Sequence, residues 1–330
     1  MTLAELAKLS CTSVSTVSKA FSGSAEISEA TKERIFSVAK EHGCFDKYYK
    51  GPRERKIIAI LCPETESEYY GIQIGLLERE FSARGADSVI FLTRFDPERE
   101  ARAFNEMVYR LRVDGVVLIG TGSLVRNPDG IPLVNIGQRP RPESRADTIS
   151  INMKSAMDEL IKTVKDFGYR RIAFIGEPLT ASHLRTFKSS MRRFGLPVNE
   201  NYIVTAEARF AEAGRLGMET LLLQKELPEV VICSYDQIAF GAMSLTRERG
   251  YRIPDDICFV GKDDVSATDY LDVPLASIHT HTEDMCKQIA DLIFHRIDNR
   301  HYRERENMGI SSSLNLRSSL IPKKDKRSLD

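Results

Sequence analysis

The sequence predicts an α/β protein with a small helical N-terminal domain and a larger two-lobed body built on parallel β-sheets. The chain has 330 residues, 42% of them hydrophobic, enough for two or three domains with buried cores. Its first 45 residues show only helical hydrophobic spacing. From Lys56 onward, β-branched apolar runs alternate with amphipathic segments, an order typical of parallel sheets covered by helices on both faces.

The N-terminal 45 residues are expected to form three short helices. Ser13 and Ser28 stand where helix N-caps belong, and Gly23 and Gly43 stand where helices should end. Each helix has one apolar face, so the three predict a minimal bundle. The apolar residues are Leu3, Leu6 and Ala7, then Val17, Ala20 and Phe21, then Ile35, Val38 and Ala39.

The body contains two successive series of strands and helices, which predict two similar lobes. The first has expected strands at 57–62, 87–92, 115–120, 132–137 and 148–151, with helices at 69–84 and 97–111. The second has helices at 153–167, 181–194, 210–225 and 236–249, with strands at 171–176, 202–205, 229–234 and 257–261. The tail adds a strand at 275–278, a helix at 282–299, the segment 312–321 and a polar, disordered end at 323–330.

Charge is balanced over the chain as a whole, with 47 basic and 47 acidic residues, so it favours neither nucleic acid nor a membrane as partner. Residues 1–56 hold ten basic and seven acidic side chains, the pattern of a basic head on an acidic body, although a solvated mixed-charge surface gives similar values. The six cysteines are scattered without a C-x-x-C pair, which indicates reduced thiols. The polar N-terminus and the lack of a long apolar run predict a cytoplasmic protein without a membrane partner.

Residues 2–22 have the spacing of a helix, a tight turn and a second helix, the geometry that lays the second helix in a DNA major groove. Hydroxyl, Val and Lys side chains contact base edges and phosphates. The same spacing also fits a bundle helix whose Ser and Thr residues only cap and solvate it. The expected outward face carries Val14, Ser15, Ser18 and Lys19, with positioning contacts from Thr2, Ser13 and Thr16.

The stretch TLAELAKLSCTSVSTVSKAFSG, followed by ISEATKERIFSVAKEHG, closely resembles the DNA-binding headpiece of the lactose/galactose-repressor (LacI/GalR) family of bacterial transcription regulators. The likeness continues in VDGVVLIG, YRRIAFIG, GLPVNENYIV, DQIAFGAM, YRIPDDICFVGKDD and PLASI, and covers about residues 2–320. It implies a homodimer that reads a pseudo-palindromic double-stranded DNA operator. It also implies a body like that of periplasmic sugar-binding proteins, with a small-molecule effector, a sugar or glycoside, held between the lobes.

The resemblance also assigns residues by position. In the headpiece, Val14, Ser15 and Lys19 become base readers, and the phosphate contacts become Thr2, Ser13, Thr16, Ser18 and Ser22. In the cleft, Arg185 matches the family's effector-binding arginine and Asp263 its cleft aspartate; a guanidinium and a carboxylate each hold two vicinal sugar hydroxyls. Tyr69 and Tyr70 match an aromatic pair that stacks on a sugar, while packing in the lobe core is the alternative.

The chain departs from the family in the head. The turn's usual Gly-Val is Cys11-Thr12, so we expect a turn formed without the residue that tolerates positive φ. The linker CFDKYYKGPRERK lacks the leucines of the family's hinge helix and contains a helix-breaking Gly-Pro. We hypothesise that its basic residues follow DNA phosphates with little intercalation, with Tyr48 or Tyr49 as the alternative wedge.

The chain also departs from the family in the cleft. Tyr235 replaces an asparagine, and Gly137 replaces an aspartate. Two partners for sugar hydroxyls are lost and one ring is gained. A glycoside, an aromatic-bearing ligand and a divergent sugar all fit this change.

An enzyme is the first rival function. His279 and His281 are spaced as metal ligands on a strand, but no third ligand accompanies them. Asp263 and Asp264 are adjacent on a strand end and should point in opposite directions. We therefore expect no catalytic residue, no metal and no cofactor. A sugar-binding protein without DNA-linked regulation is the second rival, and the helical head argues against it.

The expected organisation is a helix-turn-helix headpiece at 1–45, a linker at 46–56, an effector-binding and dimerisation core at 57–322 and a polar tail at 323–330. The first lobe is expected to combine 57–151 with 279–299, and the second lobe 152–278 with 310–320. The expected function is a ligand-responsive transcriptional regulator, a repressor of carbohydrate-use genes.

Overall fold

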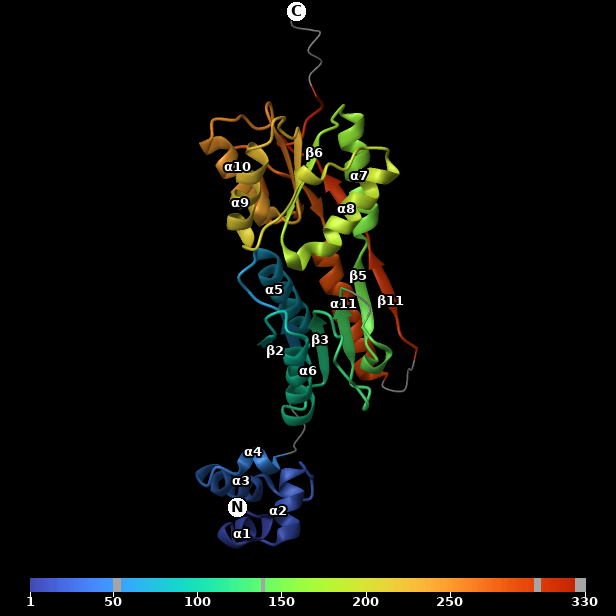
Figure 1. Ribbon diagram of the computed structural model, residues 1–330. Helices are drawn as coiled ribbons and strands as arrows, with labels where there is room; N and C mark the ends of the chain where they lie inside the picture. The colour runs from blue at the N-terminus through green and yellow to red at the C-terminus, as the bar shows by residue number, and fades with distance from the viewer. Residues whose placement is uncertain (50–54, 138–139, 300–303, 324–330) are drawn as a thin grey trace, which may run out of the picture. The chain divides into compact units, whose positions relative to one another are not determined.

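The computed structural model describes residues 1–49, 55–137, 140–299 and 304–323 (Figure 1). The chain divides into two compact units, Met1–Lys56 and Ile57–Asp330, each with its own hydrophobic core. Among the described residues, no helix is long and apolar enough to cross a membrane.

The first unit is a helical bundle of α1 (Leu3–Leu9), α2 (Val14–Phe21), α3 (Glu29–Glu41) and the short α4 (Phe45–Tyr48). The predicted N-caps are confirmed, because the Ser13 and Ser28 side chains accept hydrogen bonds from backbone amides of the first turns of α2 and α3. Gly23 and Gly43 follow the helix ends with φ of +75° and +62°. The core is formed by Leu6, Ala7, Val17, Ala20, Phe21, Ile35, Ala39 and Cys44.

Cys11 forms the turn between α1 and α2 in the left-handed conformation, with φ of +51°. The turn forms without glycine, as we expected, and the cysteine itself adopts the positive φ, at a cost of roughly 1–2 kcal/mol for an L-residue. The turn is held by the Thr12 amide, which donates to the Ala7 carbonyl at 2.9 Å, and by the buried Ser10 hydroxyl, which donates to the Leu6 carbonyl at 2.8 Å. The helix-turn-helix geometry is therefore retained without glycine.

Tyr48 and Tyr49 belong to the bundle. The Tyr48 hydroxyl donates to the Met1 carbonyl at 2.7 Å, and the Tyr49 ring stacks on Phe45 with 4.8 Å between centroids. Both rings are thus engaged with the helical unit, and α4 occupies the start of the segment that we expected to be linker. The linker residues Lys50 and Arg53 lie outside the described residues.

The first lobe of the second unit contains a six-stranded sheet in the order β11-β5-β4-β3-β1-β2. Its registered pairs are parallel, as predicted. The strands are β1 (Lys56–Cys62), β2 (Ala86–Leu92), β3 (Gly115–Ile119), β4 (Leu133–Ile136), β5 (Asp147–Ile151) and β11 (Asn307–Ile310). The helices are α5 (Glu68–Ala83), α6 (Pro97–Asn105), continued by a π-helical turn at Glu106–Arg110, and α11 (Thr282–Asp298).

Alternation along β1 shows how this sheet is covered on both faces. Ile58 and Ile60 pack into the cluster that contains α5 and α11, whereas Ala59 and Leu61 pack into the cluster that contains α6. Successive side chains of a strand point to opposite faces, so a strand buried on both sides is apolar throughout. The continuous apolar runs of the sequence follow from this arrangement.

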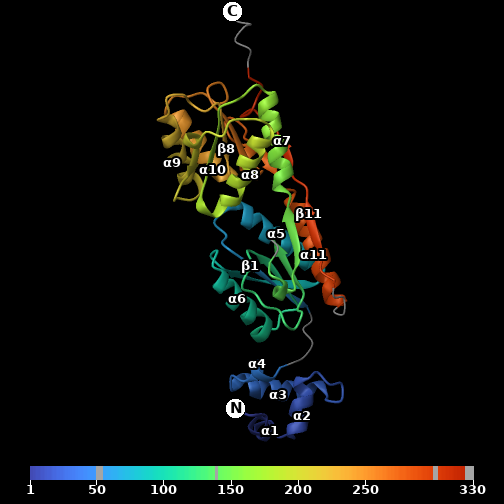
Figure 2. The same cartoon turned by 45° about the vertical axis from the view of Figure 1, so that its right-hand side comes forward.

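The second lobe repeats the design with a six-stranded sheet in the order β12-β10-β9-β8-β6-β7, parallel except for the β10–β12 pair. Figures 1 and 2 show α7 and α8 on one side of it and α9 and α10 on the other. The strands are β6 (Ile172–Gly176), β7 (Ile203–Thr205), β8 (Val230–Cys233), β9 (Cys258–Asp263), β10 (Ala276–His279) and β12 (Ser313–Asn315). The helices are α7 (Met153–Asp166), α8 (Ala181–Arg193), α9 (Phe210–Leu222) and α10 (Asp236–Glu248).

The chain passes between the lobes after β5, after β10 and after β11. The second and third of these passages differ from the expected lobe boundaries. His279 ends β10 in the second sheet, and β11 at Asn307–Ile310 joins the first sheet beside β5. The strand β11 escaped prediction because it is short, contains Gly309 and has only one buried residue, Ile310.

Candidate DNA-contacting helix and ligand cavity

The outer face of α2 carries short polar side chains and one cation. Val14 is 47% exposed, and Ser15, Ser18 and Lys19 are exposed with it, while Val17 and Phe21 are buried. This follows from the helical period, which places 14/18 and 15/19 on one side and 17/21 on the other. The structure therefore brings the three expected base readers together on one surface of the unit.

The remaining hydroxyls of this surface stabilise the ends of helices. Thr2 caps α1 in a reciprocal arrangement with Glu5, and the Ser13 and Thr16 hydroxyls lie 2.8 Å apart at the start of α2. The Ser22 hydroxyl donates to the Lys19 carbonyl at 3.0 Å. These hydroxyls therefore do cap helix ends, which is the simpler explanation of their presence. All of them are also exposed, except that of the partly buried Thr16.

Lys19 forms an ion pair with Glu26, which lies between α2 and α3. Both side chains are exposed, at 47% for Lys19 and 68% for Glu26. An exposed pair of this kind contributes about 0–1 kcal/mol, so the ammonium can exchange Glu26 for another acceptor at small cost.

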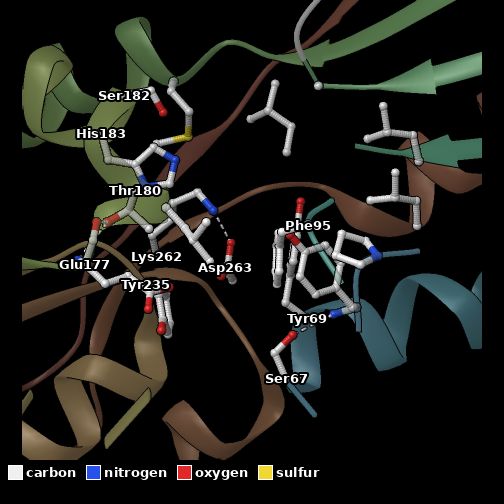
Figure 3. A pocket seen from close by; sticks show the side chains of 18 of the residues that line it. Ser67, Tyr69, Phe95, Glu177, Thr180, Ser182, His183, Tyr235, Lys262 and Asp263 are labelled. Carbon is white, nitrogen blue, oxygen red and sulfur yellow. Dashed lines mark hydrogen bonds and ion pairs between the residues drawn. The ribbon is translucent and has the colours of Figure 1, made fainter. Parts of the chain in front are cut away.

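A cavity of about 760 Å³ lies in the second unit where the two lobes face each other (Figure 3). Its lining comes largely from the carboxyl ends of strands in both sheets, where ligands of open α/β folds bind. From the first lobe it takes Ser67, Tyr69, Tyr70, Phe95, Glu100, Thr121, Gly137 and Ser150. From the second it takes Glu177, Thr180, Ser182, His183, Arg209, Phe210, Tyr235, Asp236, Lys262 and Asp263.

Aromatic rings line the cavity from both lobes. The ring centroids of Tyr69 and Tyr70 lie 5.3 Å apart at the start of α5, and the Tyr70 centroid lies 6.2 Å from that of Phe95. On the opposite side, the Tyr235 hydroxyl accepts a hydrogen bond from the Phe210 amide at 3.0 Å. Burial raises the pKa of the Tyr69, Tyr70 and Tyr235 hydroxyls. These hydroxyls are therefore neutral donors beside flat apolar faces.

Asp263 lies in the cavity, as the resemblance implied, and is paired with a residue that we did not anticipate. The Lys262 ammonium contacts the Asp263 carboxylate and lies 5.0 Å above the Tyr69 ring of the first lobe. Figure 3 shows this pair between His183 and Tyr69. Asp264 points away from the cavity, toward His279, Asn315 and Arg317, so the two aspartates diverge as predicted.

The arginine of the cavity is Arg209 rather than Arg185. Arg185 is exposed and is absent from the cavity lining, whereas Ser182, His183 and Thr186 of the same helix face the cavity. The reason is helical phase, because residue 185 is turned about 200° from residue 183. Arg185 is therefore not in a position to bind a ligand in the cavity, contrary to our expectation.

Arg209 precedes α9 and reaches across the cavity. Its guanidinium lies 3.3 Å from the Glu177 carboxylate of its own lobe and 3.7 Å from the Glu64 carboxylate of the first lobe. It is also placed over two rings, with 5.0 Å to the Phe95 centroid and 4.4 Å to the Phe210 centroid. Arg209 thus links the two lobes within the cavity.

Two titratable side chains of the lining favour their neutral forms. Burial and the nearby Lys262 ammonium lower the pKa of His183 to about 3. Burial and the Asp263 carboxylate raise the pKa of Asp236 well above its usual range. Asp236 accepts hydrogen bonds from the Ser277 hydroxyl at 2.6 Å and the Val265 amide at 2.9 Å.

Several lining residues were missed by sequence reasoning, among them Phe95, Glu177, His183, Arg209 and Lys262. A usable signal was their position, because Glu177 directly follows β6 and Lys262 lies near the end of β9. Phe95 and Arg209 offered no such signal, since their placement depends on loops.

His279 and His281 lie together with ring centroids 4.5 Å apart. The His279 Nδ1 is 2.8 Å from the Asp264 carboxylate, and the His281 Nε2 is 3.2 Å from the Ser313 hydroxyl. In the described part of the chain, no group of three His, Cys, Asp or Glu side chains is placed to hold a metal ion.

Comparison with known proteins gives two family matches. Residues 2–44 match the bacterial regulatory proteins of the lacI family, and residues 161–320 match the periplasmic binding protein-like domain. The HTH-type transcriptional repressor CytR of Escherichia coli strain K12 is 24% identical over 315 residues, covering 91% of this chain and 91% of that protein. The ribose operon repressor of Haemophilus influenzae is 27% identical over 309 residues, covering 90% and 92%.

Among solved structures, the lac repressor dimer bound to operator and the anti-inducer ONPF superimposes with a TM-score of 0.71. The two chains are 17% identical, and the match covers 97% of this chain and 98% of the other. This likeness shows that the two chains share one fold.

Proposed function

Because the chain belongs to the lacI family of bacterial regulatory proteins, we propose that it is a DNA-binding transcriptional regulator switched by a small molecule in the cavity between its lobes. The observation that supports this most directly is the joining, in one chain, of the exposed α2 face to a two-lobed core with a cavity of about 760 Å³. Relatives of nearly equal length are named as repressors. Repression of carbohydrate-use genes is the corresponding role here.

We assign base reading to Val14, Ser15 and Lys19 on α2. Val offers a methyl surface for thymine, Ser a donor and an acceptor, and Lys a donor for guanine or phosphate. The phosphate contacts are assigned to hydroxyls that surround this face: Thr2, Ser13, Thr16, Ser18 and Ser22. Few cations are needed on α2, because phosphate contacts position the protein while a small number of base contacts specify the sequence.

We assign effector binding to Tyr69, Tyr70, Tyr235 and Asp263, with Arg209 in the place that we had given to Arg185. These side chains come from both lobes, so a ligand among them changes the relative free energies of open and closed cores. Only a ligand with different affinities for the two states can alter DNA binding. A sugar or glycoside fits the mixture of flat rings and hydroxyl partners.

The remaining features of the proposal follow from the family. A headpiece at 1–45 and a core at 57–322 act in a homodimer, whose two-fold symmetry matches a pseudo-palindromic operator. We infer that the protein acts in the cytoplasm, where its operator DNA lies. The curated relatives are repressors, and the proposal includes no catalytic role.

The experiment is a footprint of the purified protein on DNA flanking its own gene, at physiological salt. We expect one protected segment with two half-sites about one helical turn apart, and an apparent mass of two chains per site. Ser15→Ala should weaken protection, whereas Ser189→Ala, on the exposed surface of the second lobe, should leave it unchanged. Absence of any protected site, with and without candidate ligands, contradicts the regulator proposal.

A further inference from the structure

Both cations that line the cavity in the described part of the chain are already paired with carboxylates. Arg209 lies 3.3 Å from Glu177 and 3.7 Å from Glu64. Lys262 contacts Asp263, and both side chains are about nine-tenths buried, at 10% and 7% exposed. An anionic ligand at these sites has to displace a carboxylate that is covalently part of the protein.

The uncharged state of His183 adds no positive charge to the lining. The described lining holds four acidic side chains, Glu100, Glu177, Asp236 and Asp263, against two cations, so acidic groups outnumber cations even when Asp236 is left out of the count. Glu100 is buried and accepts hydrogen bonds from the Thr121 hydroxyl at 3.1 Å and the Gly122 amide at 3.0 Å. The described lining is therefore negative overall, which opposes the entry of an anion.

The two phenylalanines whose rings lie beside Arg209 have an unfavourable backbone conformation. Phe95 and Phe210 have φ of +59° and +57°, in the left-handed region that side chains other than glycine rarely adopt. Such strain gathers at ligand clamps. With Tyr69, Tyr70 and Tyr235, these two rings give the cavity flat apolar faces on both lobes.

We propose that Glu177 and Glu64 are specificity-determining residues, an inference that rests on the proposed function. Their carboxylates pair with the Arg209 guanidinium. The cavity therefore selects an uncharged, hydroxyl-bearing ligand with a flat face and rejects the phosphorylated form of that ligand. The ligand stacks on the rings and exchanges hydrogen bonds with neutral tyrosine hydroxyls and with the Asp263 carboxylate. Arg209 also contacts the ligand but keeps its carboxylate partners while it does so, because a guanidinium has five N–H donors. Loss of the Glu177 charge releases the guanidinium for an anion.

The first test is a thermal-shift and calorimetric screen of the full-length protein. The probes are D-ribose, D-glucose, phenyl glucoside and adenosine, each beside its phosphate ester. A ligand that binds the folded state raises its stability. We expect at least one neutral probe to raise the Tm and its phosphate ester to bind at least about tenfold more weakly. A phosphate ester that binds as tightly as its neutral partner, or a panel without any neutral binder, overturns the proposal.

The second test compares Glu177→Gln with Glu200→Gln. Both remove one negative charge from the second lobe, but Glu200 is exposed and pairs with Lys188 outside the cavity. In Glu177→Gln the preference for the neutral probe should fall by about tenfold, because Arg209 becomes available to the phosphate. In Glu200→Gln the preference should stay as in the natural protein.

Glu64→Gln gives the same expectation from the other lobe and serves if Glu177→Gln fails to fold. An unchanged preference in the folded Glu177 or Glu64 variant overturns the proposal. Footprinting of ligand-free protein is scored separately, so a failure of the regulator proposal is distinguishable from a failure of this specificity.

Discussion

At the scale of single residues, Lys19 is the cation that the outer face of α2 offers to DNA. Lys19→Ala should weaken binding to the specific operator by about 1–3 kcal/mol, with a smaller effect on unrelated duplex, because a base contact is lost. Lys162→Ala is the matched control, since it removes an exposed lysine of the second lobe that, like Lys19, is paired with a carboxylate. Quantitative gel shifts on both duplexes provide the measurement. Equal losses on specific and unrelated DNA would reassign Lys19 to a phosphate contact.

Cys11, in the turn between α1 and α2, has a left-handed backbone conformation that is unfavourable for a residue with a Cβ atom. Cys11→Gly should stabilise the helical unit by about 0.5–1 kcal/mol, because relief at φ of +51° exceeds the entropy that glycine gains when unfolded. Cys11→Ala keeps the Cβ atom and should give no gain. Amide hydrogen exchange of α1 and α2 in the full chain measures both. An equal gain in the two variants contradicts the strain explanation.

At the scale of elements, α9 and α10 pack at a distance that only glycine permits. A Cβ atom on Gly241 would lie 1.8 Å from the Ala211 carbonyl oxygen, and one on Gly214 would lie 1.9 Å from the Ile238 carbonyl oxygen. Both helices also carry cavity residues, Phe210 and Asp236, at their first positions. The close packing therefore fixes one wall of the site.

Gly241→Ala should reduce the free energy of unfolding by roughly 3 kcal/mol, because the added methyl group meets rigid backbone and separates the helices. Gly75→Ala on α5 is the control: its Cβ atom meets nothing within 4 Å, and helix propensity should give a small gain of up to about 1 kcal/mol. Urea denaturation compares the two. Similar stability of both variants would show that α9 and α10 move apart without cost.

At the scale of the whole molecule, side chains of the two lobes contact each other beside the cavity. Arg209 contacts Glu64 and Phe95 of the first lobe from the second, and the Ser266 hydroxyl donates to Glu68 across the same gap at 2.8 Å. Contacts of this kind set the free-energy difference between open and closed cores. In the proposed regulator, a ligand acts on DNA binding through that difference.

Arg209→Ala should therefore leave ligand-free operator binding measurable and reduce the change in DNA affinity that a ligand from the screen produces. Arg185→Ala should keep both properties, because its side chain is exposed outside the cavity. Operator titrations with and without the ligand measure the coupling. A normal ligand response in Arg209→Ala together with a lost response in Arg185→Ala would restore the assignment made from sequence.

The sequence by itself determined the order of the elements apart from the short α4 and β11, the cap residues Ser13 and Ser28, and the outward face of α2, because helical and strand periods are local properties of the chain. It also placed Tyr69, Tyr70, Tyr235 and Asp263 at strand or helix ends, where the sheets present their ligand side. Tertiary structure decided which charged side chains meet. Helical phase removed Arg185 from the cavity, loop conformation brought in Arg209 and Phe95, and burial paired Lys262 with Asp263. Lys262 and Asp263 are neighbours in the chain, but the contacts of Arg209 with Glu64 and Phe95 join residues far apart in it. The energies of all these contacts depend on distance and burial rather than on residue type alone.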